Sequence, residues 1–68
     1  MQYKKLEFSD RTVWLEKDDR GRVLQSGYQI EKYKTLKCYH LSKSGTLLGK
    51  FESLPSAIVE AKKLDKPV

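Results

Sequence analysis

The sequence predicts an α+β fold: a small antiparallel sheet of four to five short strands, with one C-terminal helix packed on one face. Two observations predict it. Short runs rich in aromatic, leucine and β-branched residues alternate with turn residues along most of the chain. A stripe of apolar residues with helical spacing then occupies residues 54–64. With 68 residues, the chain is expected to form a single small domain, residues 1–68.

The first two strands are expected at residues 2–8 and 11–16. Side chains of the first strand alternate weakly between two faces. In the second strand, Val13 and Leu15 share one face and Trp14 points to the other. Either Val13 and Leu15 are buried or Trp14 is, and this choice decides which face of the strand meets the core.

A turn that contains two adjacent aspartates is expected to end at Gly21. Residues 22–26 resume an extended pattern, so residues 11–26 are predicted to form a hairpin. Gly27 interrupts the next run, and a glycine within a strand pattern often marks a bulge or a bend. Residues 22–33 are therefore either one bent strand or two short ones.

A second hairpin is predicted in the middle of the chain. Residues 35–42 favour a strand, and Gly45 in the following turn can adopt a positive φ without steric cost. With a three-residue loop at 43–45, Ser42 faces Thr46 across the hairpin. The face expected to be buried then carries Tyr39, Leu41, Leu47 and Phe51.

The other face of this hairpin would be unusual for a solvated surface. It would carry Leu36, Cys38, His40, Leu48 and Lys50. Either the N-terminal strands cover this face, which is the simpler interpretation, or it is a contact surface.

The helix is expected to begin at Ser53. This residue is a good N-cap, and Pro55 falls in the first turn, where its missing N–H has no partner to lose. The apolar residues that follow form one narrow stripe: Leu54, Ala57, Ile58, Ala61 and Leu64. Because two of them are alanines, the helix can lie close to the sheet. Pro67 is expected to end the helix.

The charge of the chain is consistent with an anionic partner. Fourteen Lys and Arg residues against nine Asp and Glu give a net charge of +5, and the pI is near 9.4. The excess is spread along the chain. Such a balance is typical of a protein that meets nucleic acid or an acidic protein partner, and it also serves to keep a small protein in solution.

The remaining composition narrows the class of protein. A single cysteine excludes an internal disulfide and suits a reducing cytoplasm, and one Cys with one His is too few for a structural zinc site. There is no run of about 18 apolar residues that would predict a membrane span, and the N-terminus has no signal-peptide pattern. We therefore expect a complete, short cytoplasmic protein with no cofactor and no bound metal.

The sequence offers little for catalysis. Cys38 and His40 are the pair that could act as nucleophile and base. On one strand their side chains share a face but lie about 7 Å apart, too far for a hydrogen bond. No orienting acid or glycine-rich phosphate loop is apparent. Cys38 is thus expected to be a structural thiol, and the protein is not expected to be an enzyme.

Basic and aromatic residues indicate a candidate binding surface, which consists of Arg11, Trp14, Arg20, Arg22, Tyr28, Lys32 and Tyr33. Cations on a sheet can hold phosphates while an aromatic ring stacks on a base. Trp14 or Tyr28 is expected to supply the ring, unless the core requires Trp14. The cations expected to contact phosphates are Arg11, Arg20, Arg22, Lys37, Lys43 and Lys50.

The C-terminal half of the chain also carries a resemblance. Its pattern consists of Y-x-L at 39–41, glycine at 45, L-x-G-x-F at 47–51, S-L at 53–54, and alanines at 57 and 61. This pattern, within residues 34–64, resembles the AP2-like and integrase arm-binding DNA-binding domains of phages and mobile elements. The resemblance implies a three-stranded sheet that lies on DNA, with a helix that braces it from behind, and it favours DNA over RNA.

The chain departs from that family in two respects. It has an additional strand at residues 2–8, and the row of arginines expected on one strand is replaced by Lys37, Lys43 and Lys50. Lysine lacks the bidentate fork of arginine, so contacts with phosphate are expected to outweigh the reading of bases.

The alternative function is that of a protein-interaction module or inhibitor. Such a protein would bind a host protein through a sheet edge or through an apolar sheet face. The contact would then be the edge strand at residues 2–8, or the outer face around Leu36 and Leu48.

Overall fold

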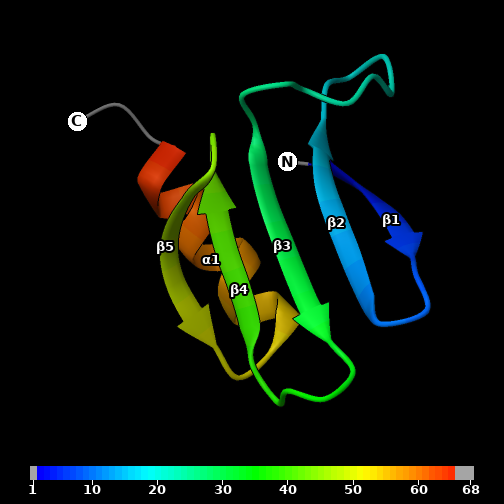
Figure 1. The fold of residues 1–68 in the computed structure, drawn as a ribbon. Coiled ribbons are helices and arrows are strands. Elements are labelled where there is room, and N and C mark those ends of the chain that lie inside the picture. The colour runs from blue at the N-terminus through cyan, green and yellow to red at the C-terminus, as the bar shows by residue number, and fades with distance from the viewer. Residues whose placement is uncertain (1, 66–68) are drawn as a thin grey trace.

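The computed structural model describes residues 2–65, and these residues form five strands followed by one helix. The elements are β1 (Gln2–Glu7), β2 (Arg11–Lys17), β3 (Tyr28–Tyr33), β4 (Tyr39–Lys43), β5 (Thr46–Phe51) and α1 (Leu54–Asp65). Neighbouring strands are antiparallel, and their spatial order is the order of the chain, β1-β2-β3-β4-β5 (Figure 1). The predicted α+β class is confirmed.

The helix covers only part of the sheet. It packs against β3, β4 and β5, and β1 and β2 extend the sheet beyond it (Figure 1). We call the side that carries α1 the helix face and the opposite side the open face, which no element within residues 2–65 covers. The N-terminal strands therefore lie beside the second hairpin in the same sheet. The expectation that they cover its outer face is wrong.

The core lies between α1 and the middle of the sheet. Its buried residues are Tyr28, Ile30, Leu41, Ala57 and Ala61. Partly buried side chains pack around them: Tyr3, Trp14, Tyr39, Phe51, Leu54 and Ile58. Ala57 and Ala61 confirm the predicted stripe, and their small side chains let the helix lie close to the sheet. Leu64, at the end of the predicted stripe, is 49% exposed.

The start of α1 is the one predicted. The hydroxyl of Ser53 accepts a hydrogen bond from the backbone N–H of Ser56 at 3.3 Å, and its carbonyl accepts one from the N–H of Ala57 at 3.2 Å. Lys62 and Lys63 lie in the last turn, where positive charge complements the helix dipole. The end predicted from Pro67 lies outside the described residues.

The turn between β4 and β5 is shorter than predicted. It has two residues, Ser44 with φ 52° and Gly45 with φ 81°, and Lys43 pairs with Thr46. Positive φ at both central positions is the type I′ geometry, whose twist matches the twist of the flanking strands. The predicted three-residue loop is therefore wrong by one residue.

A bulge in the β4–β5 ladder compensates for the shorter turn. Beyond the bulge Leu41 pairs with Gly49, and Tyr39 pairs with Phe51. Tyr39, Leu41 and Phe51 therefore contribute to the core region, as predicted. Leu47 lies on the turn side of the bulge and is 55% exposed, so its predicted burial is wrong.

The first hairpin also differs from the prediction. β2 pairs with β3, and residues 22–26 contribute only an isolated bridge between Lys17 and Val23 within the described chain. Residues 18–27 form a loop that begins at Asp18, whose carboxylate accepts hydrogen bonds from two backbone N–H groups at 2.9 Å each. The predicted hairpin over residues 11–26 is therefore replaced by a longer one.

Gly27 marks a close approach of two segments. A Cβ at this position would lie 2.9 Å from Oε1 of Glu16. That oxygen accepts a hydrogen bond from the backbone N–H of Tyr28 at 2.9 Å. The glycine thus allows a β2 carboxylate to fix the start of β3. Residues 22–33, predicted as one bent strand or two short ones, contain the single strand β3 and the isolated bridge at Val23.

Candidate nucleic-acid interface

The register of the sheet divides its charged side chains unequally between the two faces. The charged strand residues of the open face are Lys4, Arg11, Lys17 and Lys50 against Glu31. Those of the helix face are Lys5, Lys32 and Lys43 against Glu7 and Glu16. With four cations and one carboxylate, the open face carries a formal charge of +3, whereas three cations and two carboxylates give the helix face +1.

The carboxylates near the open face already have partners. Oε1 of Glu31 accepts a hydrogen bond from Gln29 at 2.8 Å, and its Oε2 lies 3.6 Å from Nε of Arg11. Asp10 lies 3.2 Å from the other end of the same guanidinium. Three open-face cations have no ion pair among the described residues: Lys4, Lys17 and Lys50. They are available to an external anion.

Arg11 brings aromatic rings together at one end of the open face. Its guanidinium carbon lies 5.3 Å from the ring centroid of Phe8 and 5.7 Å from that of Tyr33. The rings of Tyr33 and His40 meet edge-to-face, with centroids 6.2 Å apart and planes at 71°. Phe8 is 45% exposed, and the other three side chains are half-buried. We call these four residues the aromatic–arginine cluster.

Further cations lie on the same face as this cluster. Lys50 pairs with His40 across β4 and β5, so the two side chains are neighbours on the open face. Lys4 lies on β1 at the far edge of the same face. Rings that stack on bases, with cations that follow the backbone phosphates, form the usual arrangement of a sheet that binds a single strand.

The structure separates the cations predicted to act together. Arg11 and Lys50 lie on the open face. Lys43 lies instead on the helix face, with its ammonium 4.6 Å from the ring centroid of Tyr28. The other predicted cations lie in loops at opposite ends of the sheet, the β2–β3 loop and the β3–β4 loop (Figure 1): Arg20 and Arg22 in the first, Lys37 in the second.

The rings predicted to stack on bases lie on the helix face. Tyr28 is 4% exposed and belongs to the core, so its prediction as a stacking residue is wrong. Trp14 packs against the core, with its ring centroid 5.7 Å from that of Tyr39. The structure thus supports the alternative in which the core uses Trp14.

The predicted binding surface included Tyr33 but not Phe8 or His40. The feature that could have identified the cluster is the pairing of the strands. Once β2 pairs with β3 and β3 with β4, simple alternation brings Arg11, Tyr33 and His40 to one face. The prediction assigned residues 22–26, rather than 28–33, as the partner of β2, so the pairing that brings these rings together could not be seen.

Cys38 and His40 are closer than predicted. The thiol sulfur lies 3.6 Å from Nε2 of the imidazole, because Cys38 sits in a bend just before β4 rather than in the strand. Nδ1 of His40 is buried without a hydrogen-bond partner. Since an unpaired buried N–H is disfavoured, the proton is expected on Nε2, which then donates to the sulfur. Among residues 2–65, His, Cys, Asp and Glu side chains form no group of three that could hold a metal ion.

No protein-family model matches the chain, and no curated protein or solved structure matches it. No helix within residues 2–65 has both the length and the apolar character needed to cross a membrane. The function proposed for the chain therefore rests on its fold and its open face.

Proposed function

We propose that the chain is a small, non-catalytic nucleic-acid-binding protein of the cytoplasm that binds a single strand across its open face. One observation carries this proposal: the aromatic–arginine cluster lies on a sheet face that no element within residues 2–65 covers, and Lys4, Lys17 and Lys50 on that face have no ion pair among these residues. Exposed rings on a sheet stack on bases without strong sequence preference, and the lysines neutralise phosphates.

DNA is the nucleic acid that we propose first. The resemblance to AP2-like and integrase arm-binding domains implies a three-stranded sheet that lies on DNA with a helix behind it. The packing of α1 on one face of β3, β4 and β5 supports this choice. Because those domains bind duplexes, a duplex is the comparison ligand. The aromatic–arginine cluster favours a single strand, since bases within a duplex are already stacked on each other.

Anisotropy titrations with labelled oligonucleotides test the proposal. Single-stranded DNA should bind more tightly than the matching duplex or RNA. Three or four phosphate contacts on a single strand predict a log–log salt slope of about −2 to −3, from roughly −0.7 for each contact. Absence of binding to single and double strands at low salt would rule out the proposed function.

Variants locate the site. Tyr33→Ala should weaken single-strand binding by about 1–3 kcal/mol, the usual loss when a stacking ring is removed. Neighbouring lysines of β1 provide a matched pair, because Lys4 lies on the open face and Lys5 on the helix face, 3.3 Å from Glu7. Lys4→Ala should weaken binding and flatten the salt slope, and Lys5→Ala should do neither. Equal effects of the two changes would mean that binding follows net charge rather than the open face.

A further inference from the structure

The two edges of the sheet are protected to different degrees. On β1, Lys4, Lys5 and Glu7 are exposed, and charged residues on an edge strand oppose pairing with another chain. On β5 the one charged residue is Lys50, and the exposed apolar residues are Leu47 at 55% and Leu48 at 42%. The outer backbone groups of β5 have no strand partner within the described residues, since β5 ends the sheet. The β5 edge is therefore open to another strand.

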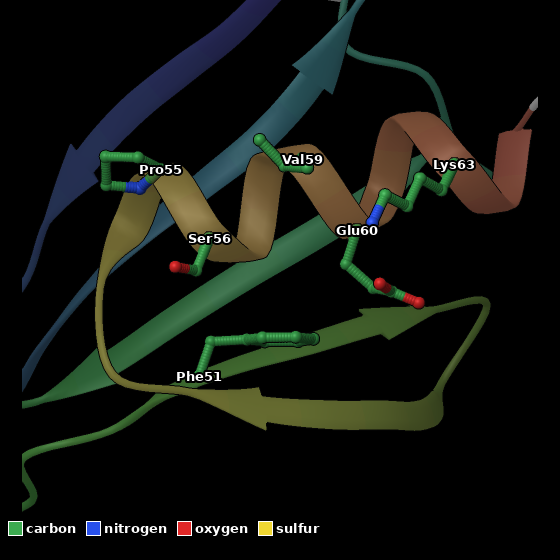
Figure 2. A pocket seen from close by; sticks show the side chains of 6 residues that line it. All are labelled: Phe51, Pro55, Ser56, Val59, Glu60 and Lys63. Carbon is green, nitrogen blue, oxygen red and sulfur yellow. The ribbon is translucent and has the colours of Figure 1, made fainter.

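A shallow pocket of about 370 Å³ lies beside this edge, between β5 and α1 (Figure 2). It is lined by Phe51, Pro55, Ser56, Val59, Glu60 and Lys63. Figure 2 shows the ring of Phe51 between the strand and the helix, with the side chains of Ser56 and Glu60 pointing from α1 toward the strand. Val59 is 50% exposed, so the pocket presents apolar surface to solvent.

We propose that β5 and this pocket form a docking site for an extended acidic segment of a partner protein, which adds to the sheet as a further strand. Main-chain hydrogen bonds to an edge strand give such complexes their affinity, and pockets for alternate side chains give specificity. Side chains of the added strand alternate between the two faces. Those on the helix face reach the pocket, and those on the open face lie beside Lys50.

The charges around the edge select the kind of segment. Lys50 and Lys63 have no ion pair among residues 2–65, and an acidic side chain opposite Lys50 would form a favourable cross-strand pair. The pocket lining contains Glu60 and Lys63, whose opposite charges favour neither a cation nor an anion, so the side chain that enters the pocket is uncharged. The net charge of +5 opposes the pairing of two copies of the chain. The ligand is thus an extended segment in which uncharged apolar residues alternate with Asp or Glu.

Peptide selection tests the site. A display library of random twelve-residue peptides is selected on the immobilised full-length chain, and calorimetry then measures the affinity of synthetic copies of the enriched peptides. We expect enriched peptides to alternate apolar with acidic residues. Backbone N-methylation should abolish binding at every second position, where the peptide N–H pairs with β5. A selection that enriches no peptide, or that enriches basic peptides, would overturn the proposal.

A matched pair of variants places the site on the molecule. Val59→Asp replaces an apolar part of the pocket lining by a carboxylate, which repels an acidic peptide, and should weaken binding of the selected peptides by about tenfold or more. Val23→Asp makes the same change in the β2–β3 loop, where Val23 is 41% exposed, and should leave their affinity unchanged. Both variants should bind single-stranded DNA like the parent chain, which separates this site from the open face. Equal peptide binding by the two variants, or a dimer in sedimentation that Val59→Asp dissociates, would contradict an acidic peptide as the occupant.

Discussion

The two halves of the sheet are held by different interactions. β3, β4 and β5 pack against α1, and the residues with no exposed surface belong to this half: Ile30, Leu41, Ala57 and Ala61. Among the described residues of β1 and β2, only Val13 is buried, at 5% exposed, and the backbone of α1 packs on β3, β4 and β5 rather than on these two strands. Yet β1 and β2 supply Lys4, Arg11 and Lys17, most of the positive charge of the open face. The C-terminal half thus provides stability, and the N-terminal hairpin provides binding surface.

The largest expected loss of stability follows from truncating a side chain at the centre of the core in the C-terminal half. Leu41→Ala should lower the free energy of unfolding by about 3–5 kcal/mol, because the side chain is fully buried between the sheet and the helix and its loss leaves a cavity. Leu6→Ala on β1 is the matched change in the other half and should cost less than about 1 kcal/mol, since Leu6 is only half-buried. Urea denaturation measures both. Equal costs would remove the distinction between the halves.

Together with Tyr3, Trp14 is one of the residues that couple the two halves. It comes from β2, but its ring packs against the core and against Tyr39 of β4. Trp14→Ala should cost about 2–3 kcal/mol, somewhat below the usual range for a fully buried tryptophan, because the ring is half-exposed. Trp14→Phe should recover part of this loss. If neither change shifts the urea midpoint, the N-terminal hairpin contributes nothing to the stability of the core.

The N-cap of α1 is the next largest contribution. Ser53→Ala removes the acceptor of the Ser56 N–H and should lower stability by about 0.5–2 kcal/mol. Ser53→Asp, which also accepts that hydrogen bond, serves as the control and should retain most of the stability. Thermal melts by circular dichroism distinguish the two variants. A stable Ser53→Ala variant would show that the helix does not depend on this cap.

The smallest effect is confined to alkaline pH. Burial raises the pKa of Tyr3 to about 12, with further contributions from Glu16, Tyr28 and Asp65. A tyrosine in the unfolded chain titrates near pH 10, so Tyr3 does not change the stability below about pH 10, and stability falls as the pH rises from there toward 12. Tyr3→Phe should remove part of this fall. It should also remove a late-ionising component from the ultraviolet signal of phenolate, and a phenolate titration with the same late component in both chains would contradict the burial of Tyr3.

Local sequence patterns were sufficient for the elements but not for their pairing. Alternation within residues 2–8 and the cap at Ser53 depend on neighbours in the chain, and both were predicted. The path of residues 18–27 depends on Glu16 and Asp18, whose carboxylates bind backbone N–H groups across the loop. The sequence pattern of residues 22–26 does not indicate that β3, rather than these residues, is the strand that pairs with β2.

By itself, the sequence determined the α+β class, the order of the elements and the start of the helix, because these depend on residues close together in the chain. Only the tertiary structure decided which residues share a face. Arg11, Tyr33 and His40 come from three strands and meet because each strand pairs in one particular register. A shift of one residue would send every side chain of a strand to the opposite face, and the register is fixed by contacts along the whole sheet.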